Sequence, residues 1–224
     1  MYFNRKGGPM KLVLGSESEF RKKLMEDAGY EFVCVPSFID EKSIRKDDPK
    51  ELVLALGHAK AVKVATGFRR GDDVLIIASD QVVVRLSDQL EIIEVLEKPL
   101  DAQGYKDRDL AWSMLDSYRN GYVQTITSLV LLNMQNTASW SRVDTCRVEL
   151  EPFSLKEMDE MVEDPYVYKA CGALPYGVPE SIAADIIGKH IKKFHGDPTS
   201  FIGLPMTALR QSLSALGYYR AQVA

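Results

Sequence analysis

The feature that most constrains the fold is a pair of β-branched, apolar stretches in the middle of the chain. Residues 124–134 and 139–149 alternate or run apolar, and the polar pair Gln135-Asn136 lies between them. Two such stretches joined by a turn predict a long antiparallel hairpin. Shorter strand and helix patterns precede and follow this hairpin in irregular alternation. A regular doubly wound sheet would require strict alternation, so the sequence predicts an α/β or α+β fold with a mixed sheet.

The remaining elements are predicted from hydrophobic periodicity and from the residues that begin and end helices. Strands are expected at residues 10–14, 32–36 and 74–84, the last interrupted by polar residues, followed by a hairpin over residues 86–95. Helices are expected at residues 19–28, 49–66, 107–119, 153–162 and 206–216. Residues 182–190 fit either a helix or a strand.

Composition narrows the class of protein. The chain has 224 residues, of which 46% are hydrophobic and 27% charged, which is typical of a globular protein. The net charge of −4 argues against binding to a nucleic acid polymer, because such proteins usually carry a basic excess. The longest apolar runs have the length of strands, so no membrane span and no membrane partner are predicted.

Three cysteines, Cys34, Cys146 and Cys171, form an odd set without metal-ligand spacing. They indicate free thiols in a reducing compartment rather than a disulfide framework. Residues 1–8 lack the apolar core of a secretory signal. A cytoplasmic location is therefore expected.

The loop from Gly15 to Arg21 connects a predicted strand to a predicted helix. It offers hydroxyls from Ser16 and Ser18, free backbone N–H groups and the positive end of a helix dipole, and Arg21 adds a cation on the first turn. This combination suits an anion, above all phosphate. The alternative is that Ser18 is only the N-cap of the helix and Arg21 a solvated surface residue.

An acid interrupts the apolar strand at Asp80. Burying an unpaired carboxylate is costly, so Asp80 should meet a metal ion, a cation or water in a cleft. There it could orient or deprotonate a water molecule or hold Mg²⁺. The alternative is a carboxylate at a strand end that caps a turn.

Three further segments are weaker candidates. Lys98 before Pro99 could clamp a phosphate, although Lys-Pro is usually surface loop, and Asp40-Glu41 is either a solvated acidic pair or a source of a metal ligand. Lys60, on the second helix, would ordinarily be a solvated helix lysine. No phosphate-binding P-loop, dinucleotide-binding, zinc-protease or serine-hydrolase motif is present in the sequence.

Taken in order, these segments resemble the Maf family of nucleotide pyrophosphatases. The family pattern runs from a strand into SxSxxR and a helix, then through an Asp-Glu pair, AxxKA, SD[TQ]V, KP and a C-terminal GDxxxxxGLP. The corresponding residues here are Ser16–Arg21, Asp40-Glu41, Gly57–Ala61 with Lys60, Ser79–Val82, Lys98-Pro99 and residues 196–205. Each piece is short, and the specificity comes from their fixed order over residues 10–218.

The resemblance implies a Maf/ITPase-like fold, with an elongated mixed sheet, flanking helices and a deep cleft between two lobes. It implies one domain over residues 10–220 after an N-terminal extension of residues 1–9. It also implies hydrolysis of a nucleoside triphosphate to the monophosphate and pyrophosphate, with Mg²⁺ or Mn²⁺ as cofactor, by a homodimer.

By the same resemblance, Asp80 is expected to be the catalytic residue, whose carboxylate accepts a proton from the attacking water. Phosphate-facing positions are taken by Ser16, Ser18, Arg21, Lys60 and Lys98, and a metal site by Glu41 and Asp80.

Two residues bear on the choice of base. The pair Phe20 and Gln81 is similar to a subgroup that favours 7-methyl-GTP, whereas members with Arg and Thr favour dTTP and UTP. An aromatic face attracts the positive ring of a methylated guanine, and a Gln amide offers a donor and an acceptor. The alternative is that Phe20 is a core residue and Gln81 satisfies a strand end.

Some positions depart from the family pattern. Glu19 replaces a common loop proline, and the K/R-x-H often found near Tyr122 is missing. Gly177 stands where the family often has Gln or Glu, and Glu180 is a candidate to replace that polar side chain. Three alternative functions remain: a dTTP/UTP pyrophosphatase, a catalytically silent nucleotide-binding module, and an inosine triphosphatase. The N-terminal TxNxxK motif that is usual in inosine triphosphatases is absent from the sequence.

Overall fold

The structure is a computed structural model that describes residues 10–119 and 121–218. The predicted N-terminal extension, residues 1–9, and the last two residues of the predicted domain lie outside the described residues.

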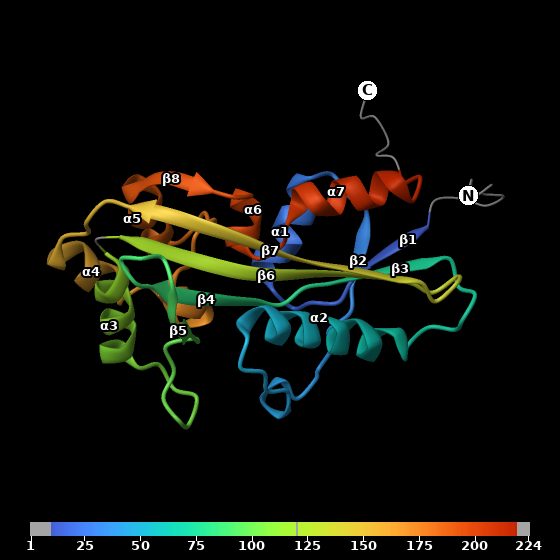
Figure 1. The fold of residues 1–224 in the computed structure, drawn as a ribbon, viewed down its shortest axis with the longest axis horizontal. Helices are drawn as coiled ribbons and strands as arrows, with labels where there is room; N and C mark the ends of the chain where they lie inside the picture. Colours follow the sequence, from blue (N-terminus) through green and yellow to red (C-terminus); the bar gives the residue numbers. More distant parts are fainter. Residues whose placement is uncertain (1–9, 120, 219–224) are drawn as a thin grey trace.

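The long central hairpin is confirmed. Strand β6 (Tyr122–Asn133) pairs antiparallel with β7 (Ser139–Leu150), in a register that runs from Tyr122↔Glu149 to Leu132↔Ser139. On its other side, β6 pairs with β4 (Gln81–Leu86) along its first half and with β3 (Val74–Ala78) along its second half. The two long strands therefore run through the whole molecule and connect its two ends (Figure 1).

The predicted interrupted strand over residues 74–84 corresponds to β3 and β4. The pairings Ala78↔Val130 and Gln81↔Thr127 keep one register along β6 across the break. Ser79 and Asp80 form the break, and the backbone N–H of Asp80 donates to the Ser128 hydroxyl at 3.0 Å. The polar pair therefore falls in the middle of a buried sheet rather than at its edge.

The other strands extend the sheet on both sides. Parallel pairing joins β1 (Lys11–Leu14) to β2 (Phe32–Cys34) and to β3, whereas β5 (Ile92–Leu96) pairs antiparallel with β4 as the predicted hairpin. Strand β8 (Ile191–His195), which the sequence did not predict, pairs antiparallel with β7. The sheet is thus mixed, as expected.

Helices cover both faces of the sheet around β1 and β3. Helix α2 (Pro49–Ala65) lies on one face, and α1 (Glu19–Asp27) and α7 (Met206–Ala215) lie on the other (Figure 1). The strand period of two explains this arrangement, because Val13 packs with the cluster under α2 while Leu12 and Leu14 pack with the cluster under α1 and α7.

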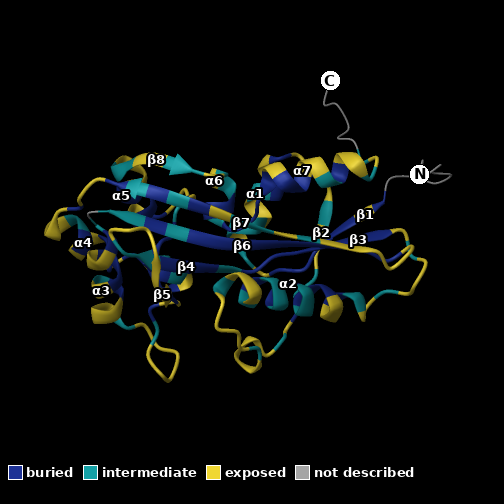
Figure 2. Ribbon diagram, viewed as in Figure 1, coloured by how far each residue is buried: buried dark blue, intermediate teal, exposed yellow. Residues whose placement is uncertain are grey.

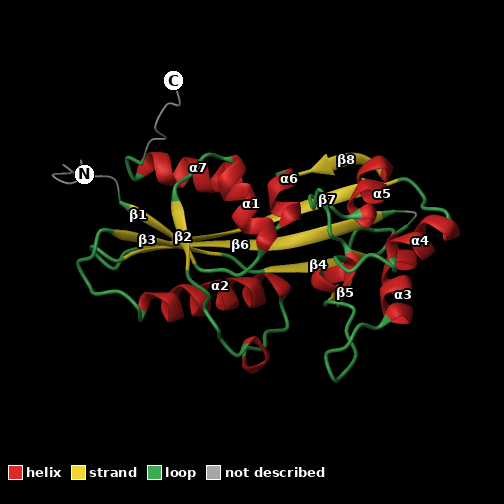
Figure 3. Ribbon diagram, turned by 180° about the vertical axis from the view of Figure 1, so that it is seen from behind, coloured by secondary structure: helices red, strands yellow, loops and turns green. Residues whose placement is uncertain are grey.

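The opposite end of the hairpin carries a second group of helices. It contains α3 (Arg108–Tyr118), α4 (Leu155–Met161), α5 (Ile182–His190) and α6 (Pro198–Ile202), as the view from behind shows (Figure 3). They pack around a core that includes Val83, Val123 and Val148. Among the described residues, three single turns of 3-10 helix complete the elements: η1 (Glu41–Ser43), η2 (Val167–Lys169) and η3 (Cys171–Ala173).

The ambiguity at residues 182–190 is resolved in favour of a helix. The Ser181 hydroxyl accepts from the backbone N–H of Ala184 and caps α5, and the predicted capping box of Ser154 and Glu157 begins α4. Helix α6 was not predicted; its start is set by Asp197, whose carboxylate accepts from the N–H of Thr199 at 2.9 Å.

The central strands are buried between the layers of helices. Most of β6 is buried along its length, whereas the outward sides of the helices are exposed (Figure 2). In the part of the chain that the structure describes, no helix combines the length and the apolar character needed to cross a membrane.

Candidate active site

A cleft of about 930 Å³ opens between the two groups of helices. Its lining comes from both, including the loops after β1 and β2, helix α2, the start of β4 and helix α6. All the site residues expected from the sequence line this one cleft: Ser16, Ser18, Phe20, Arg21, Glu41, Lys60, Asp80, Gln81 and Lys98.

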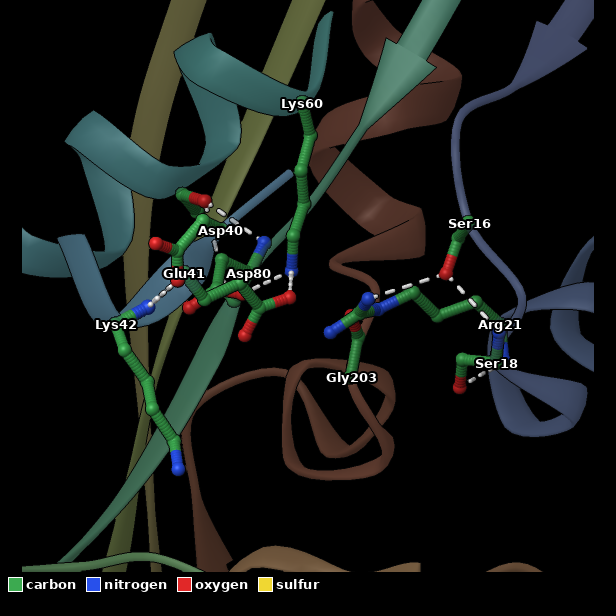
Figure 4. Close-up of polar contacts among 10 residues, drawn as sticks. Ser16, Ser18, Arg21, Asp40, Glu41, Lys42, Lys60, Asp80 and Gly203 are labelled. Carbon is green, nitrogen blue, oxygen red and sulfur yellow. Dashed lines mark hydrogen bonds and ion pairs between the residues drawn. The ribbon is translucent and has the colours of Figure 1, made fainter. Parts of the chain in front are cut away.

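Two carboxylates converge on one ammonium group in the cleft. The Nζ atom of Lys60 lies 2.5 Å from an oxygen of Asp80 and 2.8 Å from an oxygen of Glu41 (Figure 4). The side chains of Lys60 and Asp80 are only 9% and 8% exposed, whereas that of Glu41 is 55% exposed. Lys60 is therefore not the solvated helix lysine that its sequence context suggested, and Asp80 meets the cation that its burial required.

A close approach of helix to sheet produces this contact. A Cβ atom at Gly57 would lie 2.6 Å from the Ser128 hydroxyl oxygen, so only glycine allows α2 to pack this tightly on β6. Lys60 follows Gly57 by three residues and therefore shares its side of the helix. The same Ser128 hydroxyl accepts from the N–H of Asp80. Gly57 and Ser128 thus bring Lys60 and Asp80 together.

The loop after β1 is ordered by its own hydroxyls. The Ser16 hydroxyl accepts from the N–H of Ser18 at 3.1 Å and from the guanidinium of Arg21 at 3.2 Å. Ser18 caps α1 by accepting from the N–H of Arg21, which is the structural role considered from the sequence. In Figure 4 these residues lie on one side and Glu41 on the other, with Asp80 and Lys60 between them.

Arg21 is held deep in the cleft by the end of helix α6. Its Nε atom donates to the carbonyl of Gly203 at 2.8 Å, and the Ser79 hydroxyl donates to the same carbonyl at 3.0 Å. Burial lowers the pKa of the Arg21 guanidinium, and the charges of Asp80 and Glu41 oppose this. An arginine remains charged under these conditions, so a second cation faces the cleft.

Gln81 is also bound to the end of α6. Its Nε2 atom donates to the carbonyl of Ser200 at 2.7 Å and to that of Phe201 at 3.2 Å, and lies 3.1 Å from the Thr127 hydroxyl. Backbone carbonyls only accept, so the nitrogen of the amide must face them. The donors of Gln81 are thus occupied, which leaves its Oε1 atom as the group available to a ligand.

The sequence predicts no role for residues 200–203 beyond the motif that contains Gly203. In the structure Gly203 has a φ of 131°, a conformation that is strained for other residues. This conformation ends α6 and turns its last carbonyls toward Arg21, Ser79 and Gln81.

The remaining candidates lie less deeply. Lys98 is exposed at the edge of the cleft, and Phe20 is partly buried. Gly177 has a φ of 86°, and a Cβ atom there would come within 3.1 Å of the Ile202 side chain, so this backbone does not suit the polar residue of the family pattern. Glu180 is exposed and is absent from the described lining of the cleft.

Sequence reasoning also missed several lining residues. Cys171 lies in the cleft, where burial raises the pKa of its thiol. The loop after β2 contributes the exposed aromatic residue Phe38, and η1 and the residues after it contribute the cations Lys42 and Arg45. A third cation, Lys169, comes from η2. Their patterns are those of ordinary surface loop, so only the fold reveals their position.

The carboxylates of Asp80 and Glu41 are suitable ligands for a divalent metal ion. Both bind the same cationic group, which shows that their oxygens face one region of positive charge. Within residues 10–119 and 121–218 there is no cluster of three or more His, Cys, Asp or Glu residues with metal-binding geometry. A pair of carboxylates of this kind is the donor set through which Mg²⁺ usually binds, together with substrate phosphates and water.

Comparisons with known proteins match the chain to one family over nearly its full length. The family model described as Maf-like protein matches residues 11–216. The chain is 30% identical over 214 residues to the 7-methyl-GTP pyrophosphatase of Burkholderia orbicola (strain AU 1054), covering 94% of this chain and 91% of that protein. It is 26% identical over 208 residues to the 7-methyl-GTP pyrophosphatase of Dictyostelium discoideum, covering 91% and 95% of the two chains.

Similarity extends to relatives with other names. The dTTP/UTP pyrophosphatase of Agathobacter rectalis is 27% identical over 216 residues, with coverage of 92% of this chain and 97% of that protein. Among solved structures, the Ham1 protein of Staphylococcus aureus aligns with a TM-score of 0.39 and 10% identity, over 63% of this chain and 71% of that chain.

Proposed function

Because the chain belongs to the family of Maf-like proteins, we propose that it hydrolyses a nucleoside triphosphate to the monophosphate and pyrophosphate. Relatives that match nearly the full length of the chain are named 7-methyl-GTP pyrophosphatase or nucleoside triphosphate pyrophosphatase. The protein is thus a hydrolase that acts on the bond between the α- and β-phosphates.

One observation carries the proposal: a buried carboxylate, Asp80, lies beside a buried ammonium group in a cleft with several cations. The Asp80–Lys60 distance is 2.5 Å, and Arg21, Lys60 and Lys98 all line the cleft. A triphosphate requires such positive charge before water can attack phosphorus. We propose that Asp80 accepts the proton of that water.

The phosphate-facing roles are assigned to five residues. Lys60 is buried and Arg21 is partly buried, and both would meet the reacting phosphates, whereas the exposed Lys98 would meet the end of the phosphate chain. Ser16 and Ser18 order the loop before α1, and their hydroxyls can also donate to phosphate oxygens.

We assign the metal site to Glu41 and Asp80, which would hold Mg²⁺ or Mn²⁺ together with the substrate phosphates. The metal would neutralise phosphate charge and polarise the phosphoryl oxygens. Lys60 contacts both carboxylates and would orient them toward the same region of the cleft.

For the base, we propose 7-methyl-GTP as the preferred substrate. Phe20 lines the cleft beside Arg21 and can attract the positive ring by cation–π contact. The Oε1 atom of Gln81 can accept from a donor edge of the base. The alternative is dTTP or UTP, which is favoured by the similarity to a dTTP/UTP pyrophosphatase.

A product assay tests the reaction. The protein is incubated with 7-methyl-GTP, dTTP and UTP, and the products are separated by chromatography. We expect the monophosphate and pyrophosphate; nucleoside diphosphate as first product would refute the bond assignment. No product from any nucleotide would favour the alternative of a catalytically silent nucleotide-binding module.

The substitution Asp80→Asn tests the catalytic assignment. It removes the charge with little change of shape, and loss of such a role costs about 10²–10⁴-fold in rate. A variant with a cooperative melting transition and more than about a third of the wild-type kcat would contradict the role of Asp80.

Three broader features complete the proposal. We propose one domain over residues 10–220, action in the cytoplasm and a homodimer. The exposed edge strand β5, which carries Ile92, Ile93 and Val95, supports self-association, because apolar edges are usually covered. Light scattering coupled to size-exclusion chromatography would test the dimer.

A further inference from the structure

The loop between β2 and η1 presents an aromatic ring to solvent at the cleft. Phe38 lines the cleft and is 74% exposed, more than any other large hydrophobic residue in the described part of the chain. Hydrophobic side chains gain stability by burial, and this ring gains almost none in the protein alone.

The backbone at the same residue is strained. Phe38 has a φ of 43°, in the left-handed region that bulky residues rarely adopt. An exposed ring offers no packing in return for this conformation. Strained residues that persist without a structural benefit are concentrated at sites that bind ligands.

The backbone that follows Phe38 is fixed by hydrogen bonds and by an ion pair in the cleft. Two residues after Phe38, the Asp40 carboxylate accepts from the N–H of Lys42 at 3.1 Å, and the Asp40 carbonyl accepts from the Ser43 hydroxyl at 2.7 Å. The next residue, Glu41, binds Lys60 in the cleft. The strained turn is therefore fixed, through Glu41, to the group that includes Asp80.

The surroundings indicate what the ring would contact. Ile39 and Ile44 line the same side of the cleft, and Lys42 and Arg45 add positive charge beside them. An apolar surface with an exposed ring and nearby cations suits a flat aromatic group attached to a phosphate chain. Bases stack on aromatic side chains in this way, with little dependence on which base is present.

We propose that Phe38 is a substrate-binding residue that stacks on the base of the nucleotide. This role rests on the proposed nucleotide pyrophosphatase function. Phe38 lies on the Glu41 side of the cleft and Phe20 lies on the α1 side, so the two rings have separate roles: Phe38 strengthens binding of all bases, whereas Phe20 selects among them.

The main test is the substitution Phe38→Ala, with Tyr105→Ala as matched control. Tyr105 is 72% exposed and is not part of the described cleft lining. We expect Phe38→Ala to raise KM for every nucleotide by about 5- to 150-fold with kcat within twofold of wild type, because stacking contributes this range. Tyr105→Ala should leave both constants unchanged.

Inorganic tripolyphosphate separates base contacts from phosphate contacts. Its inhibition constant should be the same in wild type and Phe38→Ala, because it has no base to stack. If Phe38→Ala weakens tripolyphosphate as much as nucleotides, or leaves KM for nucleotides unchanged, the stacking role is overturned.

A binding measurement keeps this inference distinct from the activity. In Phe38→Trp, we expect a nucleoside monophosphate to quench the new indole fluorescence, and in Tyr105→Trp we expect no quenching. If wild type releases no pyrophosphate but Phe38→Trp is quenched, the proposed reaction fails and the base site stands. If pyrophosphate is released and Phe38→Trp is not quenched, the base site fails alone.

Discussion

Replacing Lys60 with Met should destabilise the protein more than any single change to its partners. The substitution keeps the length of the side chain and removes the ammonium group that lies 2.5 Å from Asp80, whose side chain is 8% exposed. Removing one partner of a buried pair leaves an uncompensated charge, at a cost of about 3–5 kcal/mol. Glu41 adds little to this cost because its side chain is 55% exposed.

The cost can be converted to a melting temperature. For a chain of this size, each kcal/mol lowers Tm by about 2–4 °C. We therefore expect Lys60→Met to melt about 6–20 °C below wild type. Urea denaturation measures the free energy of unfolding of both proteins. An unchanged slope of that free energy against urea concentration would show that the unfolded state is the same in both.

The contacts of Lys60 predict an asymmetry between the two partners. In Asp80→Asn, Lys60 retains Glu41 at 2.8 Å, so no charge is left unpaired, and we expect a loss of only about 1 kcal/mol. In Lys60→Met, Asp80 retains no charged side-chain contact among the described ion pairs. The double variant Lys60→Met/Asp80→Asn should therefore be more stable than Lys60→Met alone. A double variant that is less stable, or equal losses in the two single variants, would refute this account.

Three further predictions concern packing, pH and metal. Gly57→Ala should cost about 1–3 kcal/mol and lower kcat, because its Cβ would lie 2.6 Å from the Ser128 hydroxyl; denaturation and steady-state kinetics measure both. The N–H of Ser154, the ring of His190 and the Ser154 hydroxyl lower the pKa of Glu157 from 4.5 to about 2. This carboxylate therefore stabilises the fold above about pH 4.5, and the stabilisation is lost as the pH falls toward 2. Glu157→Gln should flatten the curve of stability against pH between these two values. EDTA should abolish pyrophosphate release, and Mg²⁺ or Mn²⁺ should restore it.

Each of these predictions has a control. Gly67→Ala should be tolerated, because the nearest atom to its Cβ would be 3.5 Å away. Lys156→Gln, next to Glu157 but 87% exposed, should leave the stability–pH curve unchanged between pH 4.5 and 2. A zinc or calcium salt that restores activity as well as Mg²⁺ after EDTA would contradict the expected metal preference.

The elements that the sequence predicted well are those with local signals. Alternating apolar residues define β6 and β7, and the capping box at Ser154 and Glu157 defines the start of α4. Strand β8 and helix α6 have five residues each, too few to show a period. They form because β7 pairs with β8, and because Thr127 and Gln81 bind the carbonyl of Ser200.

The sequence indicated which residues line the cleft, but it did not indicate how their side chains contact one another. Family resemblance indicated nine residues, and all nine line the cleft, yet no local pattern showed that Lys60 contacts two carboxylates. That contact depends on how closely α2 approaches β6 at Gly57, which is a property of tertiary packing. Likewise, the donors of Gln81 are occupied by α6, a helix that the sequence did not reveal.

The contact between Arg21 and Gly203 also has a consequence for protein synthesis. These residues are separated by 182 positions, and the bond joins the first helix to a turn that is translated much later. Since chains emerge from the ribosome in order, the nascent polypeptide displays Ser16, Lys60 and Asp80 well before the carbonyls that fix Arg21 and Gln81 exist. A chain that ends before residue 200 would contain Ser16, Lys60 and Asp80 but would lack the carbonyls that bind Arg21 and Gln81.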